Sequence, residues 1–460
     1  MTGAIAAKIN ETEAPLTIND LMEYMVAGCK APDAWRIGTE HEKFLYRKDT
    51  RAPVTYESPD GKDIKTLLQV LADRHAWTLV REGEMIVGVT KGKYSINLEP
   101  GGQIELSGAP LPDIHLVARE LHTYLDEVRK ICADLDIGIM GIGLRPKVSE
   151  QEIPPLNRPR YKALFSDENY ANHQRWGMLT AAVQCNMDYS SETDMIKKFR
   201  VSLALQPVVT ALFANSPFYR GRPSGNLSQR YHFVQTDTQQ AQRSVIETAF
   251  DTGFDFQSYI DFATSRPVRF ILEDGLYQPV KSGNFTDLMA GKLPGYEGRR
   301  ATKTDWLAHI STIHTDVRLR NYIEQRGADG GQSRLLIALP TLWTGLLYDS
   351  IALDEAYQLI KSWSVADMMY LRSHVSRSGL RTRFRVFNSV RGIALEMIKI
   401  AYRGLRNRAV KNDYSEDETM YLDRLMYYVA TGRTPAEYLL DSYHHRWSQN
   451  IDRVIDECSF

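Results

Sequence analysis

Acidic residues recur two positions apart in several short segments of this 460-residue sequence. Glu40 and Glu42 lie in one such segment, and Glu99 and Glu105 flank a Pro-Gly-Gly turn in another. Successive side chains of a β-strand point to opposite faces, so residues two apart share a face. The same spacing relates Asn97 to Glu99, Gln103 to Glu105, Gln184 to Asn186 and Asp188, and Glu324 to Arg326. The pattern predicts strands with one face of carboxylates and amides.

Each of these strands taken alone also fits an antiparallel strand that shows polar groups to water. Such solvent faces favour Thr, Lys and Ser, whereas these segments carry Glu, Gln and Asn between apolar residues. If Glu40, Glu42, Glu99, Glu105 and Glu324 converge, carboxylates about 4 Å apart repel by roughly 4 kcal/mol per pair at an effective dielectric near 20. Divalent cations would relieve that repulsion.

The ligand types indicate which cation. Oxygen ligands without His or Cys favour Mg²⁺, or Mn²⁺, over zinc. Magnesium held by a few carboxylates usually completes its shell with nucleotide phosphates and water. The polar face therefore predicts a chemistry of nucleotide phosphates.

The familiar phosphate-binding and hydrolase motifs are absent. The sequence contains no GxxxxGK(S/T), no GxGxxG after a strand, no HExxH and no GxSxG, which removes P-loop, Rossmann and α/β-hydrolase interpretations. ATP would then be held through its metal ions and through arginines near the motif segments. The candidate arginines are Arg36, Arg145, Arg160, Arg230, Arg326 and Arg334.

Composition and charge are those of an ordinary globular protein, with 43% hydrophobic and 25% charged residues. Lys and Arg number 56 against 57 Asp and Glu, so no overall field attracts nucleic acid or a membrane surface, and we expect neither partner. No apolar run approaches the length of about 18 residues that a membrane span needs. The 4 cysteines lie far apart without zinc or disulfide spacing, which favours a cytoplasmic location.

The elements that must position the polar strands are long helices. Residues 1–15 lack the apolar core of a signal peptide and are expected to form a flexible lead-in. No linker or repeat divides residues 16–460, which are predicted to be a single domain. Apolar residues three and four apart predict helices over 115–135, from about 193 to a kink or end at Pro207, and over 353–363, 393–405 and 417–430.

Ordered motifs along the chain identify a family. They are residues 37–44 (IGTEHEKF), 98–111 (LEPGGQIELSGAPL), 203–218 (LALQPVVTALFANSPF), 288–294 (LMAGKLP), 326–331 (RGADGG), 345–349 (GLLYD) and 434–437 (TPAE). Over nearly its whole length the chain resembles the plant and proteobacterial type of glutamate–cysteine ligase. The resemblance implies an α+β fold in which a curved, mainly antiparallel, glutamine-synthetase-like sheet forms a funnel with helices outside.

The resemblance also implies the reaction. ATP phosphorylates the γ-carboxylate of L-glutamate, and the amine of L-cysteine displaces phosphate from the γ-glutamyl phosphate, which is the first step towards glutathione. The enzyme would be an ATP-dependent carboxylate–amine ligase with Mg²⁺, or Mn²⁺, as cofactor and small molecules as substrates. It would be a monomer or a homodimer.

Motif positions assign the expected roles. Metal binding falls to Glu40, Glu42, Glu99, Glu105 and Glu324, and charge neutralisation in catalysis to Arg326 beside Glu324. The expected substrate-binding residues are Gln103, Gln184, Asn186, Arg145, Arg230, Gln332 and Ser333.

Departures from the family pattern leave the acceptor amine open. Leu179 stands where the family has arginine, and Gln332 and Ser333 stand where it has Pro-Trp. Losing one charge-assisted contact costs about 1.5–3 kcal/mol, which can change the accepted amine without changing the reaction class. The alternatives are a γ-glutamyl ligase that uses another amine or amino acid, and an inactive paralogue acting as a binding or regulatory subunit. The intact carboxylate set argues against the latter.

Overall fold

Within the part of the chain that the structure describes, nine strands form one antiparallel sheet. The computed structural model describes residues 13–153, 155–166, 175–273, 276–385 and 387–460. The strand order is β12-β13-β7-β1-β5-β4-β3-β2, and β6 pairs with the far part of β1. The strands are β1 Ile37–Arg47, β2 Thr78–Glu82, β3 Met85–Lys91, β4 Tyr94–Leu98, β5 Ile104–Ser107, β6 Ile137–Met140, β7 Ala182–Met187, β12 Val317–Leu319 and β13 Ile323–Asp329.

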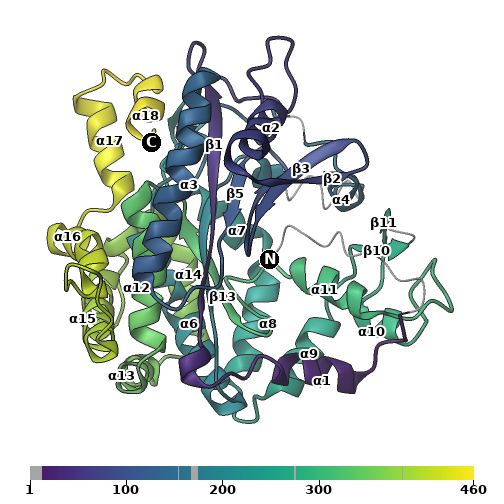
Figure 1. Ribbon diagram of the computed structural model, residues 1–460. Coiled ribbons are helices and arrows are strands. Elements are labelled where there is room, and N and C mark those ends of the chain that lie inside the picture. The colour runs from purple at the N-terminus through teal and green to yellow at the C-terminus, as the bar shows by residue number, and fades with distance from the viewer. Residues whose placement is uncertain (1–12, 154, 167–174, 274–275, 386) are drawn as a thin grey trace.

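Helices surround this sheet, so the predicted α+β class with a mainly antiparallel sheet is confirmed. In Figure 1 the strands β2 and β3 lie across the direction of β1, so the sheet curves. Small hairpins join β8 Phe218–Tyr219 to β9 Arg222–Pro223 and β10 Phe270–Glu273 to β11 Leu276–Pro279. The α-helices before β10 are α1 Ile18–Val26, α2 Ile64–His75, α3 Ile114–Asp134, α4 Pro159–Leu164, α6 Glu192–Leu212, α7 Gln229–Asp237, α8 Gln239–Phe250 and α9 Phe256–Thr264.

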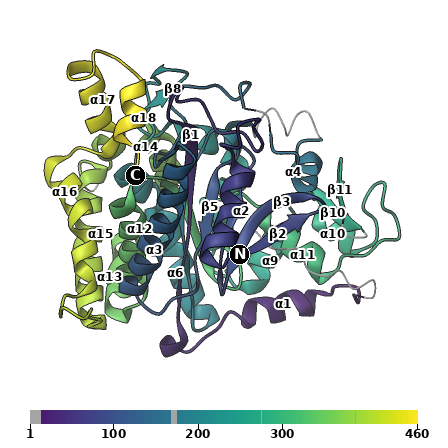
Figure 2. The same cartoon turned by 45° about the horizontal axis from the view of Figure 1, so that its top comes forward.

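The C-terminal half is mainly helical. Its helices are α10 Phe285–Met289, α11 Lys303–Ser311, α12 Ser333–Leu347, α13 Ser350–Ile360, α14 Val365–Ser378, α15 Val390–Arg408, α16 Asp423–Thr431, α17 Pro435–His445 and α18 Asp452–Glu457. Four short 3₁₀ turns lie at Pro32–Ala34, Arg175–Met178, Gly379–Arg381 and Glu418–Leu422. Figure 2 shows α3, α12, α13, α15 and α16 on one side of the molecule and α4, α10 and α11 on the other.

The two faces of the sheet differ in what covers them. Helices α6 and α12 pack behind β13 and β7, and α15 packs in turn on α12 as an outer layer. Gln325 and Cys185, which alternate with the polar residues of their strands, are fully buried on this helical side. The helices therefore support the sheet from behind and leave its polar face turned towards α4, α7 and the 311–316 segment.

The periodicity predicts the elements well. All four polar-faced segments are strands, and the predicted helices correspond to α3, α6, α13 and α15. Residues 417–430 are divided between a 3₁₀ turn and α16. Of the kink or end expected at Pro207, the end is wrong, because α6 continues to Leu212. Every residue from Val201 to Leu212 is buried, so tertiary packing offsets the lost hydrogen bond.

The expected lead-in falls mostly on residues 1–12, which lie outside the described residues. Within residues 13–15, the carboxylate of Glu13 accepts hydrogen bonds from the backbone N–H and the hydroxyl of Thr304 at 3.2 and 3.0 Å. The backbone N–H of Leu16 then donates a hydrogen bond to the Ala301 carbonyl at 2.7 Å. This part of the chain is therefore attached to α11.

No single helix of the described residues is both long and apolar enough to cross a membrane. Helices α12 and α13 are long and apolar enough when taken together, but the two meet at a bend of 92°.

Glycines allow the helix layer behind the sheet to pack closely. A Cβ atom on Gly404 of α15 would lie 1.9 Å from the carbonyl oxygen of Gly345 in α12, which is backbone and cannot rotate away. Replacing Gly404 would force the two helices apart. That separation would loosen the support of β7 and β1.

We therefore expect Gly404→Ala to destabilise the protein by about 1–3 kcal/mol, the usual range for overpacking a core. Gly253→Ala is the matched control, because its Cβ would meet only Asp251 Oδ1 at 3.5 Å. Urea-unfolding midpoints of the two variants and the parent check the expectation. Equal midpoints for all three proteins would show that the α12–α15 contact is not constrained by Gly404.

Candidate functional site

The register of the sheet brings the predicted polar residues together. Glu42 lies directly opposite Glu105 on β5, and Glu105 lies opposite Asn97 on β4. One step along, Glu40 lies opposite Gln184 of β7. In the next row, Asn186 of β7 lies opposite Glu324 of β13, which lies opposite Arg318 of β12. Three neighbouring rows of one sheet face therefore carry these side chains, as the spacing predicts.

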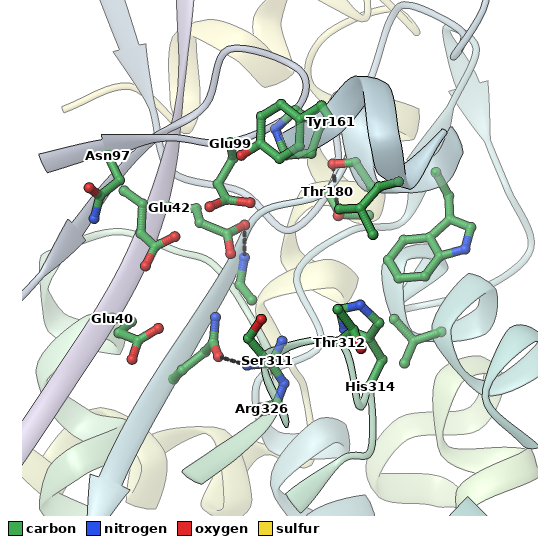
Figure 3. A pocket seen from close by; sticks show the side chains of 18 of the residues that line it. Glu40, Glu42, Asn97, Glu99, Tyr161, Thr180, Ser311, Thr312, His314 and Arg326 are labelled. Carbon is green, nitrogen blue, oxygen red and sulfur yellow. Dashed lines mark hydrogen bonds between the residues drawn. The ribbon is translucent and has the colours of Figure 1, made fainter. Parts of the chain in front are cut away.

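A pocket of about 200 Å³ lies over this face, and Figure 3 shows Glu40, Glu42, Asn97, Glu99 and Arg326 turned towards it. Glu99 sits just after β4, where its backbone pairs with Gln103 across the Pro-Gly-Gly turn. The rest of the lining comes from α4, α7, the 311–316 segment and the segment that leads into β7, together with β7 and β12 of the sheet itself. These residues are Arg158, Arg160, Tyr161, Leu164, Phe165, Trp176, Gly177, Thr180, Ala182, Gln184, Arg230, Val234, Ser311, Thr312, His314, Thr315, Asp316 and Arg318.

Carboxylates crowd together at the sheet end of the pocket. Burial, followed by the negative charge of Glu99, raises the pKa of Glu42 to about 8. Burial, followed by the charges of Glu99 and Glu40, raises the pKa of Glu105 well above its usual value. Glu42 accepts a hydrogen bond from Ala182 N–H at 3.0 Å, and Glu105 one from the Ser107 hydroxyl at 3.0 Å. This wall therefore favours the arrival of positive charge.

Arginines form the other end of the pocket. Arg318 binds both oxygens of Glu324, with Nε–Oε2 at 2.6 Å and Nη2–Oε1 at 2.8 Å. Arg326 Nη1 donates to Glu324 Oε1 at 2.9 Å and to Gln184 Oε1 at 2.5 Å. Despite its burial, the positive charges of Arg318 and Arg326 hold the pKa of the Glu324 carboxyl far below its usual value. Glu324 thus orients two arginines that face the pocket.

The fifth predicted metal ligand therefore differs from the other four. Glu324 is already neutralised by arginines, whereas Glu40, Glu42, Glu99 and Glu105 stand on the acidic wall. Among the described residues no three Asp, Glu, His or Cys side chains are arranged as a ready-made metal cage. The donor set still fits Mg²⁺, because that ion takes one or two carboxylates and completes its shell with phosphates and water.

Arg230 lines the pocket from α7, and its guanidinium forms a buried ion pair with Asp329. Its Nε donates to Asp329 Oδ1 at 2.8 Å and its Nη2 donates to the Gly327 carbonyl at 2.7 Å. Asp329 also accepts hydrogen bonds from Ser228 and Ser216 hydroxyls at 2.8 and 2.7 Å. Leaving either charge unpaired would be costly, so the pair fixes Arg230 in place.

Two predicted polar residues support their neighbours. Asn186 Nδ2 donates to Glu40 Oε1 at 2.9 Å and orients that carboxylate. Gln103 donates to the carbonyls of Gly177 and Thr180 at 2.8 and 2.7 Å and accepts from Gly101 N–H at 2.9 Å. Gln103 does not line the pocket, and its side-chain amide is taken up by these backbone contacts. It holds the turn that carries Glu99.

Arg145, which the sequence predicts to bind substrate, also lies outside the pocket. Its guanidinium lies 4.5 Å from the ring of Phe44, donates to backbone carbonyls of Leu45 and Gly101, and is only 3% exposed. Burial lowers its pKa to about 9. Arg145 packs behind the Pro-Gly-Gly turn and has no access to the pocket, because the strand alternation that places Glu42 and Glu40 does not extend to its loop.

Gln332 and Ser333, which the sequence predicts to bind substrate, lie outside the pocket as well. They begin α12 beside the C-terminal residues, where Gln332 Nε2 donates to the carbonyls of Glu457 and Ser459 at 2.9 and 3.4 Å. They line a different cavity, together with Arg129 and Arg424. Leu179 is fully buried among Leu144, Ile153 and Met178. None of the three family departures lines the pocket over the sheet face.

Sequence reasoning missed several residues of the pocket. Of the candidate arginines, Arg160 lines the pocket, whereas Arg36 and Arg334 do not. Arg318 could have been found from the hairpin it forms with Glu324, since the two lie directly opposite. Asp316 and His314 carry no recognisable motif and are brought in by tertiary packing alone.

Comparison with known proteins gives one family. The family model described as Glutamate-cysteine ligase family 2 (GCS2) matches residues 36–457. The chloroplastic glutamate–cysteine ligase of Medicago truncatula is 42% identical over 96% of this chain and 85% of its own length. That of Arabidopsis thaliana is 41% identical over 96% of this chain and 83% of its own length.

A solved structure shows the same fold at low sequence identity. The glutamate–cysteine ligase of Francisella tularensis, solved in complex with AMP, superposes with a TM-score of 0.57 and 10% identity over 92% of this chain and 88% of its own. The predicted cytoplasmic location is wrong by this comparison, because the related plant enzymes are named chloroplastic.

The family model covers almost every motif that shapes the pocket, and the plant relatives match nearly the whole chain. The chain therefore belongs to glutamate–cysteine ligase family 2.

Proposed function

We propose that this protein joins the γ-carboxylate of L-glutamate to the amine of L-cysteine at the expense of ATP, through a γ-glutamyl phosphate. The observation that carries the proposal is the pocket itself, which sets a wall of carboxylates on the sheet against arginines within one cavity. The family membership and the relatives' names support the same reaction. A carboxylate is a poor electrophile, so activation as an acyl phosphate is required before an amine can attack.

The acidic wall is the candidate holder of Mg²⁺, or Mn²⁺, with Glu40, Glu42, Glu99 and Glu105 as principal ligands and Glu324 at the border with the arginines. Bound Mg²⁺ would neutralise phosphate charge on ATP and on the transferring group. Asn186 keeps Glu40 oriented, and Gln103 keeps the Glu99 turn in place. Rigid support of this kind is what a metal site needs from its surroundings.

The arginines act on the negative charge that phosphoryl transfer moves. Arg326 projects into the pocket with its Nη1 fixed by Glu324 and Gln184, and is proposed to stabilise the transferring phosphoryl group. Arg230 is proposed to bind a substrate carboxylate. Its contacts with Asp329 and Gly327 through Nε and Nη2 keep the guanidinium in a fixed position at the pocket. The apolar side of the pocket, with Tyr161, Leu164 and Trp176, excludes water that would hydrolyse an acyl phosphate.

Cysteine is the favoured acceptor. The alternative of another amine was motivated by Leu179, Gln332 and Ser333, and these residues lie away from the pocket. We further propose that residues 16–460 act as one catalytic domain, as a monomer or homodimer, with small-molecule substrates and with no nucleic-acid or membrane partner.

The reaction is tested by ADP release from purified protein with ATP, Mg²⁺, L-glutamate and a panel of amines, with product masses recorded. We expect cysteine to give the fastest turnover and a γ-glutamylcysteine mass. Omission of glutamate or chelation of Mg²⁺ should abolish turnover. Faster turnover with an amine other than cysteine would overturn the acceptor assignment while preserving the reaction class.

We expect Glu42→Gln to weaken Mg²⁺ dependence strongly, because the amide loses the charge that attracts the ion while keeping the side-chain shape. The concentration of Mg²⁺ giving half-maximal ADP release should rise at least about tenfold, as for a lost charge-assisted contact. Glu120→Gln is the matched control, since this partly buried carboxylate accepts from Ala109 N–H and does not line the pocket. An unchanged Mg²⁺ requirement in Glu42→Gln would remove Glu42 from the metal site.

We expect Arg326→Lys to lower kcat about 100-fold, because the single ammonium group of lysine lacks the rigid planar fork that lets Arg326 contact Glu324 and Gln184 while presenting further N–H groups to a phosphoryl oxygen. The double variant Gln332→Ala with Ser333→Ala should keep both kcat and the preference for cysteine. Steady-state kinetics with cysteine and 2-aminobutyrate measure both quantities. A changed preference in the double variant would mean that α12 communicates with the acceptor site.

A further inference from the structure

One buried carboxylate oxygen in the wall of the substrate pocket has no hydrogen-bond partner among the described residues. Asp316 lies just before β12, lines the pocket and is only 2% exposed. Its Oδ1 atom accepts no hydrogen bond from the described part of the chain. Burying an acceptor without a donor is costly, so the position calls for a donor from a ligand.

The rest of Asp316 is held firmly. Oδ2 accepts hydrogen bonds from Arg372 Nε at 3.0 Å and from the Tyr231 hydroxyl. The backbone N–H donates to Gln242 Oε1 at 2.8 Å, and the carbonyl accepts from Arg326 N–H at 2.9 Å. Oδ1 is therefore presented in one orientation before any ligand arrives, which lowers the entropic cost of binding.

Among the described residues, the arginine paired with Asp316 contacts Oδ2 and leaves Oδ1 without a donor. Arg372 donates through Nη1 to the Gln235 carbonyl at 2.9 Å and through Nη2 to the Thr238 hydroxyl at 2.5 Å. Arg230, the residue before Tyr231, lines the same pocket, and its Nε and Nη2 are held by Asp329 and Gly327. The pocket thus offers a carboxylate acceptor and a guanidinium on adjacent parts of its wall, which matches the two charged groups of a free α-amino acid.

We propose that Asp316 Oδ1 accepts a hydrogen bond from the α-ammonium group of the substrate L-glutamate, and so makes the pocket selective for glutamate over a dicarboxylic acid without an amino group. This inference rests on the proposed function, because it assigns one substrate of that reaction to a residue. Asp316 acts in binding and specificity and takes no part in bond formation.

The chemistry of the reaction selects glutamate over cysteine for this contact. The cysteine amine must lose its proton before it attacks the acyl phosphate, and a nearby carboxylate favours the protonated form. The glutamate ammonium group keeps its protons throughout both steps. A fixed carboxylate is therefore useful to glutamate and unhelpful to the nucleophile.

The test compares L-glutamate with glutarate, which has the same two carboxylates and no amino group. Binding is measured by calorimetry, and kcat/KM by ADP release in the presence of cysteine. We expect the parent protein to prefer L-glutamate, and Asp316→Asn to lower kcat/KM for L-glutamate about 10- to 100-fold, as for one hydrogen bond to a charged group. The values for glutarate and the KM for cysteine should not change.

Asp305→Asn is the matched control. Asp305 is 3% exposed and paired with Arg299 at 2.9 Å, as Asp316 is paired with Arg372, but it does not line the pocket. Its variant should keep the parent preference for L-glutamate over glutarate. A general loss of stability would lower both substrates' values equally, whereas the proposed contact affects only the substrate with an amino group.

The outcomes separate the two proposals. An equal loss for L-glutamate and glutarate in Asp316→Asn, or a loss confined to cysteine, would overturn the inference. If that variant fails to fold, the parent protein decides, because equal binding of glutarate and L-glutamate would overturn the inference without any substitution. If the parent forms no γ-glutamyl product with any amine, the proposed function fails, and the binding preference alone still tests Asp316.

Discussion

The antiparallel register between β1, β5 and β7 is the constraint on which the rest of the structure depends. It places Glu42 directly opposite Glu105 and Glu40 opposite Gln184, so like charges are held together on a half-enclosed surface. A slip by one residue would turn every carboxylate into the helical core and every apolar residue into the pocket. The burial of Val183, Cys185 and Leu106 behind the sheet excludes that slip.

Holding like charges together has consequences for the opposite wall. Burial and, after it, the negative charge of Glu99 raise the pKa of Glu42, and the hydrogen bond from Ala182 N–H does not offset them. Arg318 and Arg326 are bound to Glu324 and Arg230 is bound to Asp329, so the arginines of the pocket offset the charges of Glu40 and Glu42 only in part. The pocket therefore stays divided into an acidic and a basic side. A metal–phosphate complex carries charges of both signs and fits such a division.

The arginines keep their positions through buried ion pairs. The bulge of β13 between Gln325 and Ala328 aims Arg326 at the pocket, and the Gly327 carbonyl in the bulge accepts from Arg230 and from the Thr210 hydroxyl. A Cβ on Gly327 would lie 2.6 Å from Gln206 Nε2, so the bulge packs tightly on α6. Such pairs add little net stability after desolvation, and their value here is orientation. The helix layer behind the sheet is thus part of the site's geometry.

Differences between a chain and its family are informative only once their positions are known. Leu179, Gln332 and Ser333 appeared to modify the acceptor site, because they lie next to strongly matching motifs in the sequence. In the fold, Leu179 fills a small apolar cluster and Gln332 contacts the C-terminal segment. Proximity along the chain carries no information about which side of a strand or helix end a residue serves.

The sequence by itself determined the strands, the shared face of Glu40, Glu42, Glu105 and Glu324, and the family. It could do so because residue alternation in a strand is a local property that fixes the direction of each side chain. Only the tertiary structure decided the other half of the pocket. Asp316 and Arg318 come from one segment around β12 and Tyr161 comes from α4, far away in the chain, while Gln103 and Arg145 contact backbone carbonyls around the Pro-Gly-Gly turn. Their roles depend on which loops pack over the sheet, and that is set by contacts between residues far apart in the chain.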